Sequence, residues 1–76
     1  MKNIAKTITY KQTGYDGRAR RYIVMEYADN VPMYEYKGKI NGNRVTLYPY
    51  RRVLATEART RPIEISVFDL RAKEKS

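Results

Sequence analysis

The sequence predicts a mainly β protein, folded as a small five-stranded antiparallel barrel or curled sheet. Two dipeptides, Asp16-Gly17 and Asn41-Gly42, carry this prediction, because each is a strong signal for a hairpin turn between alternating residues. A third observation is the alternation in residues 63–67, which is typical of a strand with one buried face. The 76 residues suffice for one domain over 1–70, and we expect 71–76 to be a flexible charged tail.

The first predicted hairpin takes its register from a two-residue turn with Asp16-Gly17 at the tip. One face is then apolar and is expected to be buried; it holds Ile8, Tyr10, Ile23, Met25 and Tyr27. The other face is expected to contact water; it holds Thr7, Thr9, Lys11, Thr13, Arg18, Arg20, Tyr22 and Glu26, with Val24 as the exception. A slip by one residue would mix the two sets, so the pattern and the turn favour the same register.

The second predicted hairpin has Asn41-Gly42 at its tip, which pairs Lys39 with Arg44 across the strands. A three-residue turn over 41–43 is the alternative, and it would stack two pairs of tyrosines. We prefer the two-residue turn because it separates apolar from polar residues. Its water-facing side carries Lys37, Lys39, Arg44 and Tyr48.

The remaining segments complete the predicted plan. Residues 29–32 break the chain between the hairpins, and 51–59 form either a short helical segment or an irregular connection that Pro62 ends. Five short antiparallel strands with a helical turn before the last one resemble the SH3-like small barrel in architecture. An open five-stranded sheet with one packed helix is the alternative. The expected core is Ile4, Ile8, Tyr10, Ile23, Met25, Val45, Leu47, Val53 or Leu54, Ile63, Ile65 and Val67.

Composition limits the chemistry of the chain. It holds no cysteine and no histidine, which excludes thiolate sites and removes the commonest metal ligand and general base. We therefore expect no metal site and no cofactor. No stretch is long and apolar enough for a signal peptide or a membrane span, so we expect a cytoplasmic protein without a membrane partner.

The net charge of +8 indicates a polyanionic or acidic partner. Lysine and arginine bind phosphates, and tyrosines offer bases a surface on which to stack. We therefore predict a nucleic-acid-binding module for DNA or RNA. Its candidate binding residues are Lys11, Arg18, Arg20, Tyr22, Lys37, Lys39, Arg44, Tyr48, Tyr50, Arg51 and Arg52.

Two alternatives stay open. The same surface suits an acidic protein partner, since tyrosine and arginine dominate protein–protein contacts, and the chain would then be an inhibitor or adaptor of the kind that phages and mobile elements encode. A homodimer is also compatible with this size. Tyr50-Arg51-Arg52 before a C-terminal strand resembles RelE-like ribosome-dependent toxins, which imply RNA cleavage, but that family opens with helices. We expect no enzymatic activity and no catalytic residue.

Overall fold

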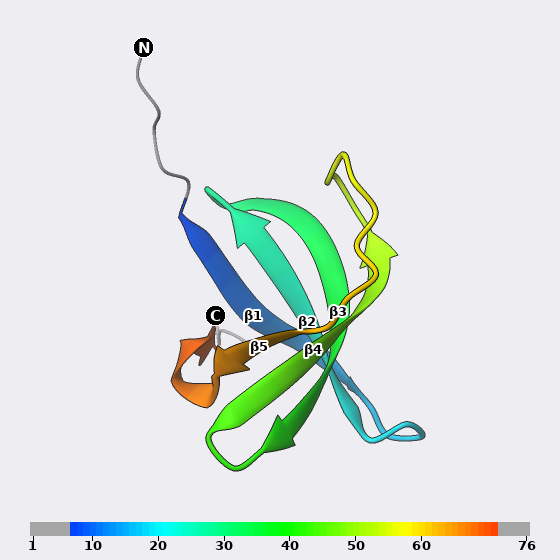
Figure 1. Ribbon diagram of the computed structural model, residues 1–76, viewed down its shortest axis with the longest axis vertical. Coiled ribbons are helices and arrows are strands. Elements are labelled where there is room, and N and C mark those ends of the chain that lie inside the picture. The colour runs from blue at the N-terminus through cyan, green and yellow to red at the C-terminus, as the bar shows by residue number, and fades with distance from the viewer. Residues whose placement is uncertain (1–6, 72–76) are drawn as a thin grey trace.

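Six strands form one sheet in the structure, a computed structural model that describes residues 7–71. The sheet is strongly curled (Figure 1). The strands are β1 (Ile8–Asp16), β2 (Arg21–Ala28), β3 (Val31–Asn41), β4 (Arg44–Arg52), β5 (Ile63–Ser66) and β6 (Leu70–Arg71), with the 3-10 turn η1 (Val67–Asp69) before the last. Their order across the sheet is β5-β4-β3-β2-β1-β6. The predicted mainly β fold with five antiparallel strands in a curled sheet is therefore confirmed.

The sheet is curled into a half-barrel. The chain crosses from one edge of the sheet to the other through η1. β1 to β5 are antiparallel neighbours in chain order, whereas β6 pairs with β1 in parallel. Only the three residues of η1 separate β5 at one edge from β6 at the other, so the two edges must lie close together. Arg71 belongs to β6, and the rest of the predicted tail lies outside the described residues.

The short helix predicted near 51–59 is wrong. β4 continues to Arg52, and residues 53–62 form an irregular segment that we call the strap. The first three residues of the strap share one hydrogen-bond acceptor. The N–H groups of Val53, Leu54 and Ala55 all donate to the carbonyl oxygen of Met33, at 3.0 to 3.2 Å. Residues 53–62 contain no helical turn, so the irregular alternative is the correct one.

The first hairpin has a longer loop than predicted, and its register differs. Asp16 pairs with Arg21, and residues 17–20 form the loop. The Asp16 carboxylate accepts hydrogen bonds from the backbone N–H groups of Arg18 and Ala19, and Arg20 takes the positive φ of 57°. Asp16 thus caps a four-residue loop instead of occupying a two-residue turn.

This register, together with a bulge between Gln12 and Gly14, inverts the predicted faces of β2. Val24, Glu26 and Ala28 are buried against the core, although Val24 and Glu26 were expected on the water-facing side. Ile23 and Met25 alternate with them and lie on the opposite face of the sheet. The predicted core position of these two residues is therefore wrong.

The other two turns are tight. Asp29 and Asn30 both have positive φ, 52° and 68°, as a type I′ turn requires, so the predicted break is itself a hairpin between β2 and β3. The β3–β4 turn has Gly42 (φ 64°) at its first central position, and Asn41 pairs with Arg44. The predicted partner of Arg44 is Lys39, so the register is shifted by two residues. A shift of two changes the cross-strand partners but keeps every side chain on its predicted face. The three-residue alternative is wrong.

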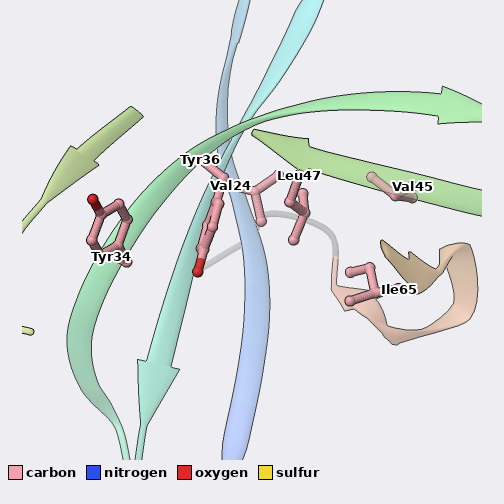
Figure 2. Packing of buried hydrophobic residues seen from close by; sticks show 6 residues of the cluster. All are labelled: Val24, Tyr34, Tyr36, Val45, Leu47 and Ile65. Carbon is pink, nitrogen blue, oxygen red and sulfur yellow. The ribbon is translucent and has the colours of Figure 1, made fainter. Parts of the chain in front are cut away.

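The core fills the concave side of the half-barrel. It consists of Val24, Tyr34, Tyr36, Val45, Leu47 and Ile65 (Figure 2). Tyr10, Ile63 and Val67 are partly buried and pack against this cluster, as predicted, together with Tyr22, Ala55 and Leu70. Ile8 and Leu54 are instead 45% and 59% exposed, so their predicted core positions are wrong. Val53 is half-buried outside the cluster, and Ile4 lies outside the described residues.

Candidate nucleic-acid interface

The face of the sheet opposite the core brings several predicted binding residues together. Residues that pair across strands share a face, and Lys37 pairs with Ile23 and with Tyr48, while Glu35 pairs with Met25 and with Arg51. Alternation adds Lys39 on β3, and pairing with Met25 adds Lys11 on β1. We call this surface the basic face; it comprises Lys11, Lys37, Lys39, Tyr48, Tyr50 and Arg51, with Arg44 at the β3–β4 turn.

Two exposed tyrosine rings stand on the basic face along β4. Tyr48 is 41% exposed and Tyr50 is 56% exposed. The ammonium of Lys37 lies 4.3 Å from the centroid of the Tyr50 ring, which is cation–π geometry. The same ammonium donates a hydrogen bond of 3.0 Å to the Asp16 carboxylate, so Lys37 is fixed between the β1 terminus and the ring.

The acidic residues nearest these rings are each paired with a cation. The hydrogen bond from Lys37, with one from the Ala19 backbone, lowers the pKa of Asp16, and the bond to Asp16 raises the pKa of Lys37. Glu35 accepts a hydrogen bond of 2.9 Å from Arg51, whose side chain remains 58% exposed. Both negative charges are thus compensated within the protein, while Arg51 can still contact an outside anion.

The remaining cations of the basic face differ in their partners. Arg44 lies 3.6 Å from Glu64, and both side chains are more than half exposed, so this pair is weak. Lys39 is exposed and makes no ion pair with another described residue. Lys11 lies with its ammonium 5.8 Å from the ring centroid of Tyr27. Lys39, Arg44 and Arg51 therefore all present exposed charge on the basic face, and Arg51 directly follows Tyr50 in the sequence.

Four predicted binding residues lie elsewhere. Arg18 and Arg20 are exposed in the loop 17–20, at the same end of the sheet as the β3–β4 turn (Figure 1). Tyr22 packs against the core and meets Tyr15 edge to face at 5.0 Å, so its predicted water-facing position is wrong, for the reason of register given above. Arg52 pairs with Tyr34 and lies on the opposite face from Arg51.

The concave side holds a buried polar cluster that the sequence did not indicate. Glu26, only 4% exposed, accepts hydrogen bonds from the Tyr36 hydroxyl at 2.7 Å and from the Arg59 guanidinium at 2.5 Å. The Tyr34 hydroxyl donates to the Arg59 carbonyl and accepts from the Arg59 N–H, at 3.3 and 3.1 Å. Arg59 thereby ties the strap to the sheet.

The titration properties of this cluster follow from its burial. Burial raises the pKa of Tyr36 well above its ordinary value, and the hydrogen bond to Glu26 acts in the same direction. Burial alone would lower the pKa of Arg59, but its bonds to Glu26 and Tyr36 outweigh that effect and raise it. The cluster is satisfied internally, since no buried side-chain polar atom of the described residues lacks a partner. We therefore assign it a structural role.

Comparison of the chain with protein-family models, curated proteins and solved structures found no match. Within residues 7–71, no helix has the length and apolar character needed to cross a membrane. In the same range no three acidic side chains gather as a metal-binding group would require. The exposed rings and cations of the basic face make it the candidate site.

Proposed function

We propose that the protein binds nucleic acid through the basic face. The observation that carries this proposal is the pair of exposed rings, Tyr48 and Tyr50, flanked by cations while the neighbouring carboxylates are already paired. Cations supply attraction to phosphates through counterion release, and the rings supply flat apolar surface for bases. The net charge of +8 adds long-range attraction for a polyanion.

The salt dependence of binding tests this proposal. Anisotropy of labelled single-stranded DNA, duplex DNA and RNA is followed from low to physiological salt. We expect binding that persists at physiological salt, with log K falling linearly with log salt. Lys39→Gln should reduce the magnitude of that slope by about 1, because one phosphate contact is lost.

Arg52→Gln is the matched control, because it removes one positive charge from the opposite face of the same sheet. It should leave the slope unchanged. Equal effects of the two variants would show that only net charge matters and would contradict a defined interface. Binding that is equally weak for all three ligands and disappears at physiological salt would also contradict the proposal.

An acidic protein surface is the second candidate partner. Tyr48, Tyr50 and Arg51 are of the residue types that dominate binding hot spots, and they lie together on one face. Such a partner would bind with a fixed stoichiometry, and alanine at one tyrosine would cost more affinity than removal of a single charge. Titration calorimetry against a candidate acidic protein would measure both properties.

A further inference from the structure

We infer that the basic face binds single-stranded nucleic acid, with unpaired bases stacked on Tyr48 and Tyr50. This inference rests on the proposed function and names the form of its ligand. Tyr48 and Tyr50 lie two positions apart on β4, and they are 41% and 56% exposed, so a ligand above the sheet can reach both rings. An aromatic side chain on a sheet can stack only on a base whose own flat face is accessible.

The faces of bases are hidden in a duplex, where each base is covered by its neighbours. A protein can then reach only base edges in the grooves and the phosphates outside. Exposed rings beside cations would gain little from such a ligand. In a single strand the bases can be splayed out, and stacking then contributes to affinity with little dependence on sequence.

Tyr50 is held in position before any ligand arrives. Its ring lies 4.3 Å from the Lys37 ammonium, and that ammonium is itself hydrogen-bonded to Asp16. A ring that is already oriented loses less side-chain entropy on binding, so more of the stacking free energy appears as affinity. Lys37, whose charge is compensated by Asp16, acts here as a positioning residue for Tyr50.

The accessible cations flank the rings on both sides. Arg51 follows Tyr50 directly, and Lys39 lies two residue pairs from the Lys37–Tyr48 pair, on the same face of the sheet. A strand with its bases on the tyrosines would therefore have its phosphates near one or the other cation. Arg18 and Arg20, in contrast, are exposed in the loop 17–20, where the phosphates of a duplex could contact them without any base stacking.

The test compares a single strand of oligo(dT) or oligo(rU), about 10–16 nucleotides long, with a duplex of equal length. We expect wild-type protein to bind the single strand more tightly. Tyr48→Leu and Tyr50→Leu should each weaken single-strand binding by about 5- to 150-fold while leaving the salt slope and duplex binding unchanged. The variants keep an apolar side chain at exposed positions, and urea unfolding verifies that they fold.

Tyr15→Leu is the matched control, because Tyr15 is 54% exposed but contacts Tyr22 instead of the basic face. It should bind the single strand like wild type. The role of Lys37 is tested in the same assay: Lys37→Gln should weaken binding in wild type without changing the salt slope. In the Tyr50→Leu background its effect should be smaller, because the ring is gone and only the uncompensated charge of Asp16 then opposes the strand.

The outcomes separate this inference from the proposed function. Single-strand binding that is unaffected by both leucine variants, or a duplex preference that depends on Arg18 and Arg20, would overturn the inference and leave nucleic-acid binding standing. Absence of binding to every ligand at physiological salt would overturn both.

Discussion

The buried carboxylate of Glu26 forms an ion pair with the part-buried guanidinium of Arg59, 33 positions away in the sequence, and this pair ties the strap to the concave side of the half-barrel. Arg59→Ala removes the cation and leaves a carboxylate that is 4% exposed with only the Tyr36 hydroxyl as partner. We expect a loss of about 2–3 kcal/mol in the free energy of unfolding, measured in urea, because a buried charge without its counterion is costly.

Two variants check the cause of that loss. Glu26→Gln in the Arg59→Ala background removes the unpaired charge and should recover part of the stability. Arg51→Ala breaks the more exposed pair with Glu35 and should cost less than about 1 kcal/mol. If Arg59→Ala cost no more than Arg51→Ala, the Glu26–Arg59 pair would not be what fixes the strap.

The raised pKa of Tyr36 predicts a loss of stability in alkali. Above about pH 10 the unfolded tyrosine ionises, whereas burial keeps the folded one protonated. The folded state then holds more protons than the unfolded state, so stability is complete below that pH and falls as the pH rises. Urea midpoints between about pH 8 and 11 should decline in wild type.

Tyr36→Phe should make this decline shallower, because the ionising group is gone, and should cost about 1 kcal/mol at neutral pH for the lost hydrogen bonds. Part of the decline should remain, because burial also raises the pKa of Tyr10. An unchanged alkaline profile in the variant would assign the decline to other groups.

Gly38 is needed for the close packing of β3 against the core. A Cβ placed there would lie 3.1 Å from Leu47 and 3.3 Å from Val45, both fully buried. Gly38→Val adds three carbons to this space and should cost roughly 1–3 kcal/mol in urea unfolding through overpacking. Gly17→Ala is the control, since its Cβ would meet nothing within 4 Å, and wild-type stability of Gly38→Val would contradict this packing.

The Asp16–Lys37 hydrogen bond predicts an acid-side effect. The lowered pKa of Asp16 means that its contribution to stability is present above about pH 3.9 and is lost as the pH falls through the folded value. Carboxyl chemical shifts from NMR titration should report that value directly. Lys37→Gln should raise it toward the ordinary value, though not fully, because the backbone bonds from Arg18 and Ala19 remain. No change would exclude Lys37 as the cause.

The hairpins could be predicted because turn residues act locally, but their registers could not. Asp16-Gly17 marks a turn in either case, and only the hydrogen bonds of the Asp16 carboxylate select the four-residue loop. Apolar residues in β2 occur on both faces, as in Ile23-Val24-Met25, so alternation there cannot distinguish the two orientations. In β3 and β4 alternation is clear, and the predicted faces are those observed.

The same difference in the regularity of alternation determines which residues of the candidate site could be predicted from the sequence. Lys37, Lys39 and Tyr48 could be placed on one surface because their strands alternate regularly. Tyr22 could not, since its face depends on the loop length and the bulge in the first hairpin. The buried position of Glu26 depends on its ion pair with Arg59, 33 positions away in the sequence. No local sequence pattern predicts a partner at that distance.

The pairing of β6 with β1 bears on the order in which the molecule folds. Tyr10 pairs with Leu70 and Lys11 with Arg71, so two residue pairs join segments 60 positions apart in the sequence. Every other strand pair joins neighbours in the chain and closes a far shorter loop. The hairpins should therefore form first and this contact last. By the same reasoning the β1–β6 contact should open first in the native state. Amide hydrogens on the side of β1 that faces β6 should then exchange with solvent before those of β2 and β3.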